Sequence, residues 1–308
     1  MPDVVAVPGY VLKSALALIY ASKKRGIPLI LMSDSNLENM PRYFITEMVK
    51  KRLVSICDAG FVAGKKSRAY MKRLGMVENS IFDGYDVVDN EHFINGNGTA
   101  APEGFLFVGR FVSVKNIPFL LRAYSIYKAQ LGGRAWPLKL IGTGELENEL
   151  IALANALNLQ DKVQWLGYKD YEKINDEYHR SKILILPSLS ETWGLVVNEA
   201  MASRLPVLVS SQCGCIPDLV NEGINGYIFN PTDIKNLIAL MLLVSGKSSD
   251  ELCRMGDESL KIISYFGLSR FSDNLWEAAG CAIKTKTKTF GFMDGLLIKF
   301  LFKAREGL

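Results

Sequence analysis

Two carboxylates, Glu191 and Glu199, stand eight residues apart in the segment 187–206. The apolar run 182–186 predicts a buried strand ahead of them, and a helix is expected to begin near Gly194. The free backbone N–H groups at a helix N-terminus bind phosphate. A carboxylate accepts two hydrogen bonds from a sugar diol. Glu199 therefore suits a ribose and Glu191 a second sugar, with a diphosphate between them.

Taken alone, the two glutamates favour a simpler interpretation, in which Glu191 is a capping carboxylate and Glu199 lies on a solvated helix face. Arg110 and Lys115 change this balance because they follow the expected strand 105–109 at the carboxyl edge of the same sheet. The planar guanidinium of Arg110 and the ammonium of Lys115 can together neutralise a diphosphate leaving group. The sequence contains no Asp-x-Asp motif, so we expect these cations, and no metal ion, to carry that charge.

Two other motifs favour different chemistry and are weaker. Gly142-Thr-Gly144 resembles the start of a dinucleotide fingerprint, but Glu147 stands where the third glycine belongs. Cys213-Gly-Cys215 resembles half of a metal site, yet neither histidine of the chain has ligand spacing to it. The total of five cysteines is odd and sparse, which predicts a reducing compartment and no disulfide framework.

Apolar β-branched runs alternate with helix-period stretches along most of the 308 residues, which predicts an α/β fold with parallel strands. A polar segment rich in turn formers, 84–103, separates two series of alternating strands and helices and indicates a linker. Strands are expected at 3–7, 28–32, 60–63 and 80–83, and then at 105–109, 138–142, 163–166, 182–186, 206–209 and 227–229.

Net charge and hydropathy exclude several classes of protein. The formal charge is +4, with +3 in residues 1–100, −3 in 101–280 and +4 in 281–308. This is too little to indicate a nucleic-acid partner. No apolar run approaches the length of a membrane span, and no basic region precedes the short apolar run near the N-terminus. We therefore expect a cytoplasmic protein.

The ordered motifs resemble a known family. They look like the signature of the retaining, nucleotide-sugar-dependent glycosyltransferases with the GT-B fold, called group 1 or family four. The resemblance spans roughly residues 104–285. It rests on Gly109-Arg110…Lys115-Asn116, Ile141-Gly-Thr-Gly144, Trp165-Leu-Gly167-Tyr168, Glu191-x7-Glu199 and Gly214-Cys-Ile-Pro217-Asp218…Gly226.

This resemblance implies a UDP- or GDP-sugar donor, no cofactor, and transfer of a hexose-type sugar with retention to a glycan or lipid-linked acceptor. It implies that Arg110 and Lys115 bind the diphosphate, Glu199 the ribose and Glu191 the donor sugar. Glu191, Arg110 and Lys115 are thereby the expected catalytic groups. The further donor-binding residues that it implies are Gly109, Gly142, Gly144, Glu145, Tyr168, Trp193, Gly194 and Leu195.

The resemblance also predicts two Rossmann-like doubly wound domains, the first incomplete. Residues 1–98 would form the partial acceptor domain with its linker, 99–268 the donor domain, and 269–308 helices that return toward the first domain. On the acceptor side, Asp34 would bind substrate or form a turn, and Arg42 would meet an anionic acceptor or form a surface ion pair. The incomplete domain leaves an alternative, a truncated or split transferase that binds donor without efficient transfer.

The C-terminal tail 290–308 has an amphipathic pattern. Phe292, Leu296, Phe300 and Leu301 share one helical face, with several Lys and Arg nearby. This pattern favours a peripheral contact with the cytoplasmic face of a membrane. The equal alternative is that the same face packs on the N-terminal domain.

Overall fold

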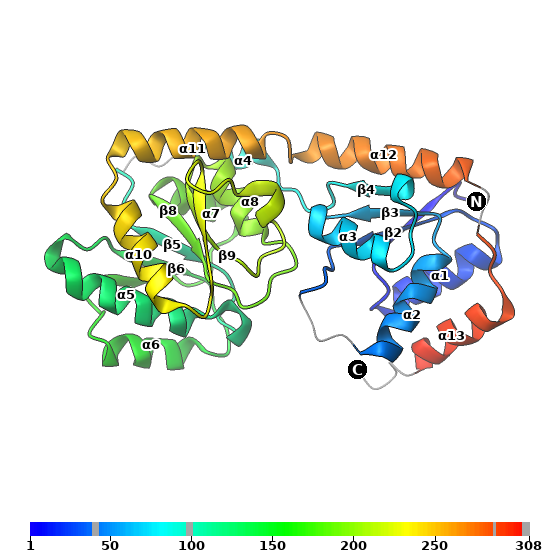
Figure 1. The fold of residues 1–308 in the computed structure, drawn as a ribbon, viewed down its shortest axis with the longest axis horizontal. Coiled ribbons are helices and arrows are strands. Elements are labelled where there is room, and N and C mark those ends of the chain that lie inside the picture. The colour runs from blue at the N-terminus through cyan, green and yellow to red at the C-terminus, as the bar shows by residue number, and fades with distance from the viewer. Residues whose placement is uncertain (39–42, 97–100, 286–287, 304–308) are drawn as a thin grey trace. The chain divides into compact units, whose positions relative to one another are not determined.

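The computed structural model describes residues 1–308 except 39–42, 97–100, 286–287 and 304–308. The chain forms two compact units, one of Met1–Val87 with Leu268–Leu308 and one of Val88–Gly267 (Figure 1). We call them the first and the second unit. Within the described residues, no helix is long and apolar enough to span a bilayer.

The first unit is built on a parallel sheet whose order follows the sequence, β1-β2-β3-β4. One face is covered by the apolar side chains of α1, α2, α3 and α13, and the other by α12. The elements are β1 (Val5–Pro8), α1 (Lys13–Lys24), β2 (Leu29–Ser33), α2 (Phe44–Ser55), β3 (Ala59–Val62), α3 (Lys65–Arg73), a 3-10 turn (Glu78–Ser80), β4 (Ile81–Asp83), α12 (Leu268–Lys284) and α13 (Phe292–Lys303).

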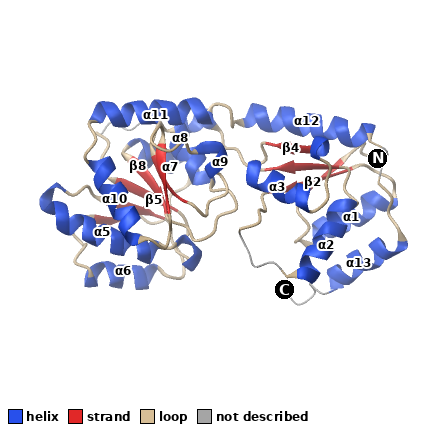
Figure 2. Ribbon diagram, viewed as in Figure 1, coloured by secondary structure: helices blue, strands red, loops and turns tan. Residues whose placement is uncertain are grey.

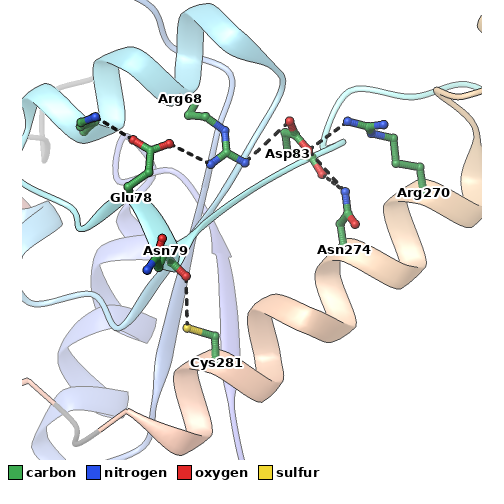
Figure 3. A network of polar contacts seen from close by, with 8 residues as sticks. Arg68, Glu78, Asn79, Asp83, Arg270, Asn274 and Cys281 are labelled. Atoms are coloured by element: carbon green, nitrogen blue, oxygen red, sulfur yellow. Dashed lines mark hydrogen bonds and ion pairs between the residues drawn. The ribbon is translucent and has the colours of Figure 1, made fainter.

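Polar contacts join α12 to the end of β4 (Figure 3). Arg270 donates to the Asp83 carboxylate at 3.0 Å, and the Asn274 amide donates to the Asp83 carbonyl at 2.7 Å. One turn apart, Ala278 and Ala282 are fully buried against the sheet. Small side chains at this spacing let a helix lie close to a sheet. The chain after residue 267 therefore belongs to the first unit.

The second unit has a six-stranded parallel sheet in the order β10-β9-β8-β5-β6-β7, with helices on both faces (Figure 2). The order reverses at β5, which pairs with β6 on one side and β8 on the other. The elements are α4 (Asn90–Ile94), β5 (Phe105–Val108), a 3-10 turn (Ser113–Lys115), α5 (Ile117–Leu131), a 3-10 turn (Gly132–Arg134), β6 (Leu138–Ile141), α6 (Glu147–Ala156), β7 (Val163–Trp165), α7 (Tyr171–His179), β8 (Ile183–Leu186), α8 (Leu195–Ala202), β9 (Val207–Ser210), α9 (Ile216–Leu219), β10 (Gly226–Phe229), α10 (Ile234–Ser245) and α11 (Ser249–Ile263).

The strands lie within two residues of the positions expected from the sequence, but the expected linker 84–103 differs. It contains the short helix α4, and the ring of Phe93 on this helix is fully buried against Tyr171 and Tyr178. Because of this packing, residues 88–96 belong to the second unit, whereas the sequence placed them in a domain ending at 98.

Candidate donor-binding site

Three glycines let the loops after β5 and β6 approach each other closely. Gly142 has a φ of 136°, and a Cβ there would lie 1.9 Å from the carbonyl oxygen of Gly109. A Cβ on Gly144 would lie 2.5 Å from the carbonyl oxygen of Phe111. The Gly109 N–H donates to Ile141 at 3.0 Å and joins the loops. These expected donor-binding glycines thus shape the carboxyl edge of the sheet through backbone contact.

The loop between β8 and α8 is joined in the same way to the loop after β9. The Gly214 and Cys215 N–H groups donate to the carbonyls of Glu191 and Trp193 at 3.0 and 3.2 Å. Gly194 caps α8 with a φ of 109°. The Trp193 ring is buried, and its Nε1 donates to Asn198 at 2.9 Å. Its side chain is therefore part of the core, which leaves the backbone as the part that can contact a donor.

Lys115 and Glu191 form a direct ion pair, although the resemblance gave them different parts of the donor. Their side chains are only 15% and 18% exposed, and the Ser188 hydroxyl also donates to the Glu191 carboxylate at 3.2 Å. A lysine has three N–H donors, so Lys115 keeps donors for a ligand oxygen. The Arg110 side chain is exposed, and no partner for it is found among the described residues.

Glu199 is held by a buried tyrosine. The hydroxyl of Tyr178, a fully buried residue on α7, donates to the Glu199 carboxylate at 2.5 Å. Burial raises the pKa of Glu199, and the Tyr178 hydrogen bond opposes that rise. The pKa of Tyr178 is raised well above its usual value by burial and by the nearby negative charge. The alternative of a solvated helix carboxylate is therefore wrong, because Glu199 is half-buried and aligned by a partner.

Sequence reasoning missed Tyr178 and the role of Asn116. Asn116 has a φ of 55°, and its amide donates to the carbonyls of Pro187 at 3.2 Å and Pro231 at 2.9 Å. It thereby joins the loops that follow β5, β8 and β10. An Asn just before an Ile-Pro helix start was the available signal, since Asn tolerates this left-handed conformation. Nothing in the sequence paired Tyr178 with Glu199.

Glu145 and Tyr168 lie at the same edge with exposed side chains, and so does Leu195 in the first turn of α8. The two histidines are used in packing. His92 stacks on Tyr171 at 4.1 Å, and Nε2 of His179 lies 2.8 Å from the Phe93 carbonyl.

Cys213 and Cys215 are buried thiols. Within the described ranges, no cluster of three His, Cys, Asp or Glu side chains suits a metal ion. None of the five cysteines, all of them described, is in a disulfide.

Asp34, which was expected on the acceptor side, lines a cavity of about 210 Å³ at the carboxyl ends of β1 and β2, entirely within the first unit. Tyr10, Tyr85 and Asp86 line it as well. Burial, and then the charge of Asp34, raise the pKa of Asp86 to about 7. Asp86 was not expected from the sequence. Arg42, the other acceptor-side candidate, lies outside the described residues.

The family model of the glycosyl transferases group 1 matches residues 90–257. This is more than half of the chain, and the chain belongs to that family. An uncharacterized glycosyltransferase of Haemophilus influenzae is 30% identical over 166 residues, which cover 54% of this chain and 45% of that protein. The lipopolysaccharide 1,6-galactosyltransferase of Escherichia coli is 24% identical over 238 residues, covering 74% of this chain and 62% of that protein.

Among solved structures, HepE from Anabaena in complex with UDP-glucose superposes with a TM-score of 0.74 at 18% identity, covering 90% of this chain and 78% of that one. This likeness confirms the expected GT-B fold with its two parallel sheets. The chain spans less than two thirds of the length of the two curated relatives above.

Proposed function

We propose that this protein transfers a hexose-type sugar from a UDP- or GDP-sugar to an acceptor hydroxyl, with retention and without a metal ion. The observation that carries the proposal is the group of charges at the strand-order reversal of the second unit. Arg110, the Lys115–Glu191 pair and the N-terminus of α8 follow β5 and β8, the two strands at that reversal. In open α/β sheets this is the place where ligands bind.

In the proposed reaction, the bond between the sugar C1 and the diphosphate oxygen breaks and a bond from C1 to the acceptor oxygen forms on the same face. The acceptor hydroxyl proton passes to the leaving phosphate. Arg110, Lys115 and the α8 N–H groups stabilise the negative charge that develops there. Glu191 binds the donor sugar, and because it is also paired with Lys115, it fixes that ammonium near the phosphate. Glu199 accepts hydrogen bonds from the ribose.

Glu145, Tyr168 and the backbone of Gly142, Gly144 and Gly167 would surround the base. Exposed backbone and side chains here are available to select the nucleotide, since the two loops are joined at Gly109 and Gly142. The UDP-glucose complex of HepE supports UDP-glucose as the first donor to test. On the acceptor side, we propose a glycan or lipid-linked glycan in contact with Asp34.

A thermal-shift screen of nucleotide sugars, followed by a transfer assay with and without EDTA, tests the proposal. We expect one UDP- or GDP-sugar to raise the unfolding temperature of the protein. We also expect transfer to continue in EDTA and the product linkage to keep the anomeric configuration of the donor. No stabilisation by any nucleotide sugar, or complete loss of transfer in EDTA, would contradict it.

The second candidate is a chain that binds a nucleotide sugar without efficient transfer by itself. It predicts donor binding and slow donor hydrolysis without transfer. Donor binding, donor hydrolysis and transfer measured on the same protein separate the two candidates.

We also propose that the protein works at the cytoplasmic face of a membrane as a peripheral protein. The support is an exposed apolar surface on α13, where Phe292 and Phe300 are 80% and 68% exposed. The lipopolysaccharide galactosyltransferase among the relatives agrees with a lipid-linked acceptor. Co-sedimentation with vesicles tests this contact.

A further inference from the structure

Helix α13 divides its apolar residues between two faces. Ile298 is 2% exposed and joins the core of the first unit, with Leu301 and Phe290 packed beside it. Asp294 is buried and paired with Arg52 on α2. Figure 1 shows α13 alongside α1, and residues of the two helices are in contact. Of the four residues on the amphipathic face expected from the sequence, only Leu301 packs on this core, and the other three are exposed.

The outer face stays exposed and is basic. Phe292, Met293, Leu296 and Phe300 are 80%, 71%, 45% and 68% exposed. The only acidic residue of α13 is Asp294, which is buried, and α1 has none. The charges beside the exposed apolar residues are therefore cationic, from Lys24, Lys299 and Lys303.

A cavity of about 250 Å³ opens between α1 and α13, with Lys24 and Lys299 in its lining and no acidic side chain. The two ammonium groups lie 6.0 and 5.7 Å from the centre of the same Tyr20 ring. Within the described part of the chain, neither lysine has an ion-pair partner. Two cations that line one cavity without a neutralising carboxylate attract a bound anion.

We propose that this cavity binds the phosphate of an anionic lipid headgroup while the protein lies on a bilayer. Lys24 and Lys299 contact the phosphate, and Phe292 and Leu296, which line the same cavity, enter the boundary of the acyl chains. The inference rests on the proposed peripheral membrane contact and adds a site to it. A second copy of this chain is a poor occupant, because an isologous contact would bring the same lysines together.

The test is the double variant Lys24→Gln/Lys299→Gln in co-sedimentation with vesicles of phosphatidylcholine alone or mixed with phosphatidylglycerol. Each lysine near an anionic surface contributes about a fivefold change in partition, so we expect the double variant to bind mixed vesicles up to about thirtyfold more weakly. The matched control is Lys235→Gln/Arg254→Gln, which removes two exposed cations of the second unit. We expect it to bind like the unmodified protein.

A third variant, Phe292→Ser, separates apolar insertion from headgroup binding. We expect it to weaken binding to the mixed vesicles while the preference for phosphatidylglycerol remains. Equal loss in the two double variants, or equal binding of the unmodified protein to both vesicle types, would overturn the headgroup site. Donor binding is measured on the same samples: if no nucleotide sugar binds but the lysine effect is seen, the proposed transfer fails and the lipid site stands.

Discussion

The sheets of the two units are built from the same strand–helix alternation, yet they differ in strand order. In the first unit, β1 to β4 run in sequence order in one direction, whereas in the second unit the order reverses at β5. At a reversal the connections leave to opposite faces, and a crevice opens at the carboxyl edge. The candidate donor charges stand at that reversal. The lesson is that strand order, rather than strand content, separates the candidate donor site of the second unit from the cavity of the first.

The units also differ in how far their ion pairs are buried. In the first unit, Lys23 and Asp58 form an ion pair at 2.9 Å whose side chains are fully buried, and Asp58 accepts from the Leu29 and Lys288 N–H groups at 2.8 Å. In the second unit, Lys115 and Glu191 remain partly exposed. The first pair holds the fold together, and the second is accessible to a ligand.

The strongest test of these separate roles is the variant Asp58→Ala. Removing one partner of a buried pair leaves an uncompensated charge, so we expect a loss of about 3–5 kcal/mol in the stability of the first unit. Donor binding, for which we propose only second-unit residues, should persist. Limited proteolysis reports the first unit, and calorimetric titration with donor reports the second.

The control for this experiment is Asp250→Ala, an exposed residue at the start of α11. It should change neither readout strongly. If Asp58→Ala abolished donor binding at a temperature where the second unit stays protease-resistant, the separation of roles between the units would be wrong.

The next largest effect is expected from Arg110→Ala. Loss of a charged hydrogen-bond partner costs about 1.5–3 kcal/mol, which raises the donor dissociation constant roughly tenfold or more. Because Arg110 is exposed, protein stability should not change. Arg122→Ala, an exposed arginine on α5, is the matched control. Unchanged donor affinity in Arg110→Ala would remove Arg110 from the site.

The sequence predicted the fold class and the strands of both sheets, because short β-branched runs and helix periods are local signals. It missed contacts between distant segments. Phe93 falls in a polar stretch, and its burial against Tyr178, together with the stacking of His92 on Tyr171, shows that α4 belongs to the second unit.

The candidate site shows the same limit. Motif spacing indicated Arg110, Lys115, Glu191 and Glu199, whose order along the chain is itself a signal. The Tyr178 hydroxyl on Glu199 and the Asp86 carboxyl beside Asp34 come from segments with no motif. Pairings of this kind depend on how helices pack, so short-range sequence patterns do not predict them.

A smaller effect is expected from Glu199→Gln, which keeps an acceptor for Tyr178 but removes the charge. We expect a several-fold weaker donor affinity, since hydrogen bonds to charged groups are the stronger ones. Burial raises the pKa of Glu199, so the affinity of the unmodified protein should fall as the pH falls through that raised pKa. The variant should lack this dependence. Equal pH profiles of donor affinity for the two proteins would contradict the ribose assignment.

The last prediction concerns the first unit and its pH dependence. The pKa of Asp86 is raised to about 7 by burial and by Asp34, above the ordinary value near 4 that applies in the unfolded chain. Folding therefore favours the protonated carboxyl. The stability that this gives is fully present below the ordinary pKa and is lost as the pH rises through about 7.

Between pH 5 and pH 8, we accordingly expect the unfolding temperature of the first unit to fall in the unmodified protein and to stay nearly constant in Asp86→Asn. Asp34→Asn removes the second cause of the shift, so the fall should move to lower pH. Thermal unfolding of the three proteins across this range is the measurement. Parallel curves for all three would show that the two carboxyls do not interact in the cavity, and Asp34 would then act alone at any acceptor site there.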